Sequence, residues 1–201
     1  MIGAPASALD VAAVLADLHS HQTDYAQQSI AEFQDILRQD PENVVAHRGL
    51  GFALFNQHDS EAAMPHLRKA AEKMPDDWLV HYYSASVMAQ KQDDALADQI
   101  EKEARLVTML NPGIADGFGL LGFALMTQKK NPEATTAYEN ALRLNPASEV
   151  YALNLAELYT LQGKMEEAKA LFARLQNSLN PRISVAARSH LELMAPAPPL
   201  F

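Results

Sequence analysis

Small and large apolar residues recur along the chain at helical spacing. In the segment VVAHRGLGFALF this stripe consists of His47, Leu50, Gly51 and Leu54. Separations of three and four positions place such residues on one face of a helix. The letters LGFAL occur a second time, from Leu121 onward. The pattern predicts that both segments are the same helix of a repeated packing unit, in which a small residue lets a neighbouring helix approach closely.

A second stripe follows the first one in each unit. The segments EAAMPHLRKA, EATTAYENAL and EEAKALFARL place Ala63, Ala134 and Ala168 near large apolar residues, again at helical spacing. Asn131 directly precedes Pro132, and proline is favoured in the first turn of a helix. Each unit is therefore predicted to be a pair of helices.

Four prolines mark the period of these units, with spacings of 34, 37 and 34 residues. They are Pro41, Pro75, Pro112 and Pro146. Because proline cannot continue a helix, each one predicts a helix end, and Asn43, Asp77 and Ser148 follow as caps of the next helix. The longer unit carries its extra residues near 91–97, which predicts a long second helix there.

These units resemble the tetratricopeptide repeat family, whose repeat is a helix–turn–helix unit, and we expect a family member or the repeat array of a larger bacterial protein. The resemblance implies an all-α fold, an α-solenoid of stacked antiparallel helix pairs wound into a right-handed superhelix of about ten or eleven helices. We expect a degenerate helix pair, four repeat-like pairs, a capping helix and an extended tail. Their ranges are 1–43, then 44–77, 78–114, 115–148 and 149–180, then 181–194, and finally 195–201.

Charge and composition narrow the classes of partner. The net charge is −9, and residues 1–100 hold 15 acidic side chains against 6 lysines and arginines. An acidic surface repels phosphate groups, so we expect neither a nucleic-acid nor a membrane partner. No apolar run approaches the ~20 residues of a membrane-spanning helix, and the first ten residues lack the pattern of a signal peptide. The absence of cysteine excludes disulfides and cysteine-based zinc sites, and it leaves the compartment open.

Seven histidines raise the question of a metal site. His47 and His81 lie one repeat apart, so we interpret them as inter-helix packing residues, with a metal pair as the alternative. His19 and His21 are two positions apart, and a helix would turn them to different faces. The acidic doublets fall near helix starts, where negative charge is favoured. We therefore expect no catalytic residues, no metal and no cofactor.

The resemblance implies that the first helices of the repeats line a concave groove that binds a peptide. The predicted groove residues are Arg48, Phe52, Phe55, Asn56, Tyr82, Ser86, Gln90, Phe123, Met126, Leu153 and Glu157. Members of the family that grip a terminal carboxylate use several basic residues, and this groove has one arginine, so that activity does not carry over. An apolar groove favours an extended peptide or an amphipathic helix. The alternative is that Phe52, Tyr82 and Phe123 belong to the core.

The sequence thus predicts a non-catalytic protein–protein interaction scaffold with a protein or peptide partner. The alternative is an accessory domain of a larger, peptidase-like enzyme whose catalytic part is not in this chain. The tail APAPPLF ends in Leu200 and Phe201, and we expect it to enter the groove of a neighbouring molecule or of its own chain. Burial of two large apolar side chains is worth ~3–5 kcal/mol, which predicts weak self-association at most.

Overall fold

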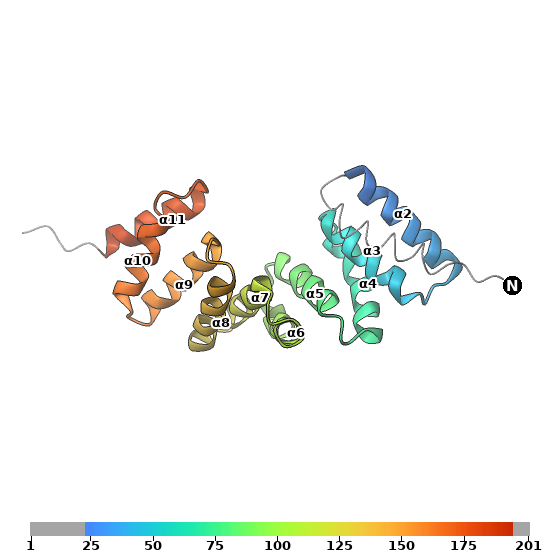
Figure 1. The fold of residues 1–201 in the computed structure, drawn as a ribbon, viewed down its shortest axis with the longest axis horizontal. Coiled ribbons are helices and arrows are strands. Elements are labelled where there is room, and N and C mark those ends of the chain that lie inside the picture. Colours follow the sequence, from blue (N-terminus) through green and yellow to red (C-terminus); the bar gives the residue numbers. More distant parts are fainter. Residues whose placement is uncertain (1–22, 195–201) are drawn as a thin grey trace, which may run out of the picture. The chain divides into compact units, whose positions relative to one another are not determined.

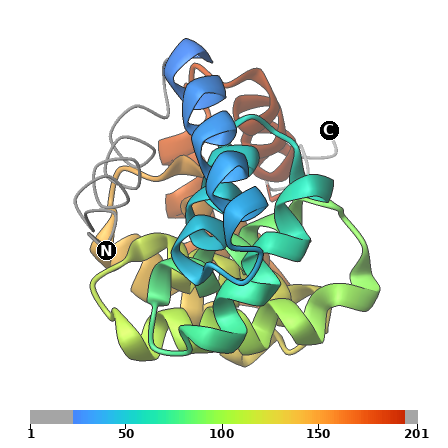
Figure 2. The same cartoon turned by 90° about the vertical axis from the view of Figure 1, so that its right-hand side faces the viewer.

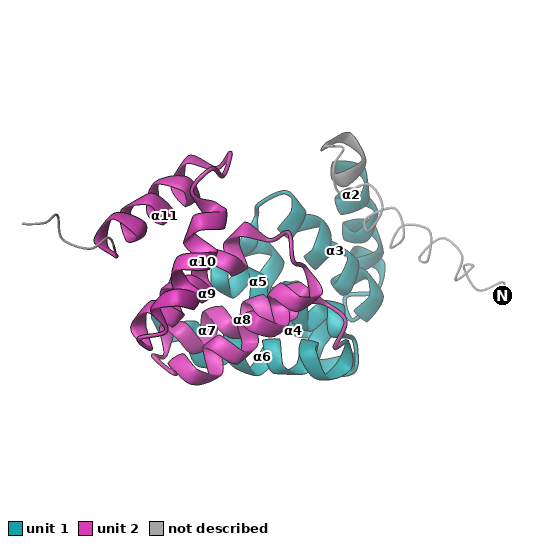
Figure 3. Ribbon diagram, turned by 60° about the vertical axis from the view of Figure 1, so that its left-hand side comes forward, with its two compact units in different colours: residues 1–111 teal, residues 112–201 magenta. Residues whose placement is uncertain are grey.

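The computed structural model describes residues 23–194, which form ten α-helices, one short 3-10 helix and no strand (Figure 1). The predicted all-α fold is confirmed. Residues 1–22 of the predicted first helix pair and the predicted tail, 195–201, lie outside the described residues. The chain divides into two compact units, residues 1–111 and 112–201 (Figure 3). The superhelix stays a prediction, and so does the grouping of the helices into repeats.

Unit 1 contains α2 to α6, and each helix packs on the next. In Figure 2, α2 lies alongside α3, in agreement with their packing. Large core side chains such as Phe33 and Leu67 are fully buried between the helices. The helices are α2 (Thr23–Gln39), α3 (Val44–Asn56), α4 (Ser60–Lys73), α5 (Trp78–Gln90) and α6 (Ala97–Leu110), with the 3-10 helix η1 (Asp94–Leu96) before α6.

Unit 2 contains α7 to α11, again with each helix against the next, and α11 also contacts α9. Small residues and one large aromatic, Phe172, make up much of the core between α9, α10 and α11. The helices are α7 (Ala115–Thr127), α8 (Asn131–Leu144), α9 (Glu149–Leu161), α10 (Met165–Leu175) and α11 (Pro181–Leu193).

The two LGFAL segments use their glycines for close helix packing. A Cβ atom on Gly51 would lie 2.7 Å from Cδ2 of Leu67, and one on Gly122 would lie 2.8 Å from Cδ2 of Tyr138. Leu67 and Tyr138 occupy the following helix of each pair, α4 and α8. The predicted reason for the small residue is therefore confirmed.

The predicted caps are also confirmed. The side chains of Asn43, Asp77 and Ser148 accept hydrogen bonds from backbone N–H groups in the first turns of α3, α5 and α9. At α8, Pro132 lies in the first turn of the helix as predicted, Asn131 is the first helical residue and Lys130 stands at the cap position.

The prediction of a long second helix near 91–97 is wrong. α6 has 14 residues, as α4 and α8 do, and the extra residues form the separate 3-10 turn η1. The carboxylate of Asp93 caps this turn by accepting from the N–H of Ala95 at 3.0 Å. A local cap thus satisfies the backbone of the insertion without lengthening the helix.

Candidate functional site

Arg48, on α3, already has interaction partners within unit 1. Its Nε donates to Oδ2 of Asp77 at 2.5 Å, and its guanidinium lies 4.6 Å from the centre of the Phe52 ring. Asp77 also caps α5, so Arg48 connects α3 to the start of α5. A partner's carboxylate would have to compete with this ion pair.

Two other predicted groove residues lie in the core of unit 1. Phe52 is 1% exposed and stacks on Tyr83 with ring centres 4.3 Å apart. Ser86 is buried as well. Phe55, which is half-buried, meets Tyr83 edge-on at 5.1 Å. The aromatic residues of this face therefore pack mainly against one another.

Glutamines at the ends of α5 and α9 form hydrogen bonds to the preceding helix, which belongs to the neighbouring helix pair. Gln90 is exposed, and its side-chain oxygen accepts from the hydroxyl of Ser60 at 2.5 Å. Gln162 follows α9 and donates to Oγ1 of Thr135 on α8 at 2.7 Å. Gln90 is therefore hydrogen-bonded to α4. The other two predicted groove residues of unit 1, Asn56 and Tyr82, are half-buried.

Unit 2 exposes large apolar side chains on α9 and α11, which lie in contact. Leu161 is 70% exposed and Leu193 is 83% exposed, and both stand at the last turn of their helices. Val150 on α9 and Val185 on α11 are exposed as well. We call the surface made by these four residues with Leu153 and Glu157 the α9–α11 face.

The helical register explains why this face is open. The buried residues of α9 lie on the opposite side of that helix, and they are Ala152, Leu155, Ala156 and Leu158. Leu153 and Glu157, both predicted for the groove, are half-buried at the edge of the open side. Phe123 and Met126, on α7, are also half-buried. Sequence reasoning missed Val185 and Leu193, although α11 repeats the register of α9.

Glu157 brings an ionisable group into this apolar surface. Burial raises the pKa of its carboxyl above the ordinary value, and the nearby His190 opposes that effect. His190 belongs to α11 and stacks flat on the Phe172 ring, with centres 4.5 Å apart. A partner that covers the face would bury Glu157 further, which favours its neutral form.

His47 and His81 make the same pair of polar contacts in successive first helices. Nε2 of His47 donates to the carbonyl of Pro41 at 3.0 Å, and Nε2 of His81 donates to that of Pro75 at 2.8 Å. The other ring nitrogen meets a second helix, where Nδ1 of His47 lies 2.7 Å from Nδ1 of His66.

The partner of His81 is Glu103 on α6, with Nδ1 2.5 Å from Oε2. This hydrogen bond raises the pKa of His81, whereas burial lowers the pKa of His66. Both contacts agree with the interpretation of the two histidines as packing residues. Residues 23–194 contain no group of three side chains that could hold a metal ion.

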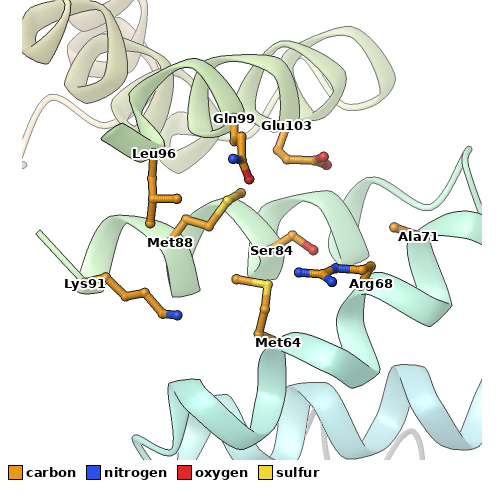
Figure 4. Close-up of a pocket in the computed structure, with 9 residues that line it drawn as sticks. All are labelled: Met64, Arg68, Ala71, Ser84, Met88, Lys91, Leu96, Gln99 and Glu103. Carbon is orange, nitrogen blue, oxygen red and sulfur yellow. The ribbon is translucent and has the colours of Figure 1, made fainter. Parts of the chain in front are cut away.

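A pocket of about 200 Å³ lies in unit 1 between α4, α5 and α6 (Figure 4), and we call it the unit 1 pocket. Met64 on α4 and Met88 on α5 contribute thioether side chains, and the buried Ser84 on α5 also lines the pocket. Arg68 and Lys91 add two cationic side chains.

An open hollow of about 490 Å³ occupies the corresponding place in unit 2, between α8, α9 and α10. Six of its lining residues stand 71 positions after lining residues of the unit 1 pocket, the same offset as between the LGFAL segments. These six are Glu139, Leu142, Leu155, Tyr159, Glu167 and Ala170. The groove between successive second helices is thus a repeated feature of the chain. Sequence reasoning missed it because it considered the first helices alone.

None of the helices within residues 23–194 is both long and apolar enough to cross a membrane.

Among curated proteins, the chain is 28% identical over 131 residues to BBSome complex member BBS4 of Bos taurus. This similarity covers 65% of the chain and only 25% of the relative. The matching part of the chain therefore corresponds to about a quarter of that protein's length.

Solved structures share the fold at low sequence identity. YrrB, described as a tetratricopeptide repeat protein with an unusual peptide-binding site, matches with a TM-score of 0.73 and 15% identity, over 90% of each chain. MamA of Desulfovibrio magneticus RS-1, from residue 41 to its end, matches with a TM-score of 0.69 and 17% identity, over 92% of this chain and 98% of that one. These similarities support the α-solenoid of stacked helix pairs.

Two family models, both described as tetratricopeptide repeat, match residues 14–77 and 125–188. They cover segments of both units, and each includes one of the helix pairs that pack through a glycine or alanine stripe. The chain belongs to the tetratricopeptide repeat family.

Proposed function

We propose that the protein is a non-catalytic scaffold that binds an amphipathic helix or an extended apolar peptide of a partner protein on the α9–α11 face. A tetratricopeptide fold is a scaffold for protein–protein interaction, so a protein partner follows from the family. The observation that supports the choice of surface is the exposure of Val150, Leu161, Val185 and Leu193 on α9 and α11, two helices in contact.

The energetics favour an apolar partner. These four make up more than half of the seven large hydrophobic side chains exposed within the described residues. Full burial of a leucine or valine is worth ~1.5–3 kcal/mol relative to exposure. Such a surface gains most from a partner that presents an apolar stripe, as an amphipathic helix does. Glu157 at the edge would accept a hydrogen bond from a polar group of that partner.

The predicted groove residues of unit 1 support this choice of surface indirectly. Arg48 and Gln90 already have partners within the fold, and Phe52 and Ser86 are buried. A ligand would therefore find less accessible apolar surface there than on α9 and α11. The role as an accessory domain of a larger enzyme stays a prediction.

The test uses a fluorescent amphipathic peptide with leucines along one helical face, measured by anisotropy. The Leu161→Glu and Leu193→Glu variants should each weaken binding by about tenfold, because they place a charge where the peptide's leucines would pack. Leu179→Glu is the matched control, since Leu179 is 99% exposed and lies in the loop before α11. Equal binding by wild type and both face variants, or equal binding of a peptide with serine in place of leucine, would refute the proposal.

A further inference from the structure

We infer that the unit 1 pocket binds a single large apolar side chain flanked by carboxylates, presented by an acidic segment of a partner protein. This site is separate from the α9–α11 face and goes beyond the function proposed above. It lies between two second helices, α4 and α6, and the first helix between them, α5.

The size of the pocket sets the kind of ligand. Pockets that enclose a small molecule usually measure about 300–1,000 Å³, and this one measures about 200 Å³. A volume of that size suits one side chain of a longer segment that runs along the groove.

The apolar part of the pocket suits a side chain such as leucine. Met64 comes from α4, and Met88, on α5, is 6% exposed. Methionine is unbranched and polarisable, so its side chain adapts to the shape of an apolar guest. Leu96 of η1 closes one side, so the insertion between α5 and α6 contributes to the pocket wall (Figure 4).

The charges around the pocket select an acidic segment. Arg68 and Lys91 are exposed, and no carboxylate within the described residues forms an ion pair with either. Residues 1–100 contain only six lysines and arginines against 15 acidic side chains, yet two of those six line this pocket. The acidic lining residue, Glu103, already accepts from His81 at 2.5 Å.

Comparison with unit 2 shows that repeat packing does not require these cations. In the unit 2 hollow, Glu139 stands where the unit 1 pocket has Arg68, and Glu167 stands where it has Leu96. The charged residues that line the unit 1 pocket are Arg68, Lys91 and Glu103, whereas those that line the unit 2 hollow are Glu139, Arg143 and Glu167. The net charge of the lining is therefore opposite in sign in the two units. An acidic segment would be attracted to the unit 1 pocket and repelled by its counterpart in unit 2.

The test follows the eight methionines of the full chain by NMR of labelled methyl groups. The probe is a short synthetic peptide with one leucine between aspartates and glutamates, and its Kd is measured in parallel by fluorescence anisotropy. We expect the peptide to shift the methyl signals of Met64 and Met88, which Met64→Leu and Met88→Leu assign. A peptide with lysines in place of the acids should leave both signals unchanged.

Variants separate local attraction from net charge. Arg68→Gln with Lys91→Gln should weaken binding of the acidic peptide about tenfold, and raised salt should reduce the difference. Lys73→Gln with Lys102→Gln changes net charge equally at exposed positions outside the pocket lining, and it should change the Kd less than twofold. Absence of binding, unmoved signals of Met64 and Met88, or equal losses in the two double variants would overturn the inference. Leu161→Glu should leave this binding intact, so failure of one site is distinguishable from failure of the other.

Discussion

Gly163 stands in the turn between α9 and α10 with a φ angle of +74°, and a Cβ added there would meet nothing within 4 Å. Gly163→Ala therefore creates no steric clash, and its effect comes from backbone conformation in the folded and unfolded states. An L-residue in the left-handed region costs ~1–2 kcal/mol, and the smaller entropy of unfolded alanine returns ~0.4–1 kcal/mol. We expect a net loss of about 1 kcal/mol in the free energy of unfolding. Asparagine tolerates this conformation better, so Gly163→Asn should lose less.

The turn between α7 and α8 offers the reverse experiment. Lys129 has a φ angle of +60°, so Lys129→Gly should gain about 1 kcal/mol in the free energy of unfolding from the same two opposing effects. Urea unfolding followed by circular dichroism measures both changes. With a slope near 2 kcal/mol per molar urea, the Gly163→Ala midpoint should fall by about 0.5 M. Equal midpoints for wild type, Gly163→Ala and Gly163→Asn would refute the reasoning from backbone conformation.

Three further predictions concern packing and pH. Gly122→Ala should destabilise the protein by ~1–3 kcal/mol, since its Cβ would lie 2.8 Å from the Tyr138 ring, and thermal melting checks this. Glu103 raises the pKa of His81 above 6.5, so the stability difference between wild type and His81→Gln should be largest below pH 6.5 and decrease as the pH rises through the raised pKa. Burial lowers the pKa of His66, so the corresponding difference for His66→Gln should be present above pH 6.5 and decrease as the pH falls toward the lowered pKa. Urea titrations over a pH series measure both, and parallel curves for the two variants would contradict them.

The helices and their close contacts could be predicted from the sequence because local chemistry determines them. Caps such as Asn43 and Asp77 satisfy the first N–H groups whatever lies further away. Gly51 and Gly122 signalled close packing because a repeat places the same contact twice.

The candidate binding surface could be predicted less accurately, because it depends on side chains of neighbouring helices that the pattern along one helix does not identify. Register alone placed Phe52 on an open face, and Tyr83 from the next first helix buries it. The unit 1 pocket requires three helices and the 3-10 turn to be in place, so spacing along one helix could not reveal it. The exposed leucine of α11, Leu193, did have a signal in the repeated register.

The hydrogen bonds from His47 and His81 to the proline carbonyls should oppose local unfolding in unit 1. His47 and His81 each reach back six residues to a carbonyl in the turn that follows the preceding helix. Breaking one of these hydrogen bonds would leave the proline carbonyl and the Nε2–H of the histidine without partners, at a cost of ~1–3 kcal/mol wherever water cannot reach them. Phe118 and Ala152 stand at the corresponding positions of α7 and α9, and their side chains have no N–H to donate. Local opening should therefore spread between neighbouring helix pairs more readily in unit 2, and amide hydrogens there should exchange earlier.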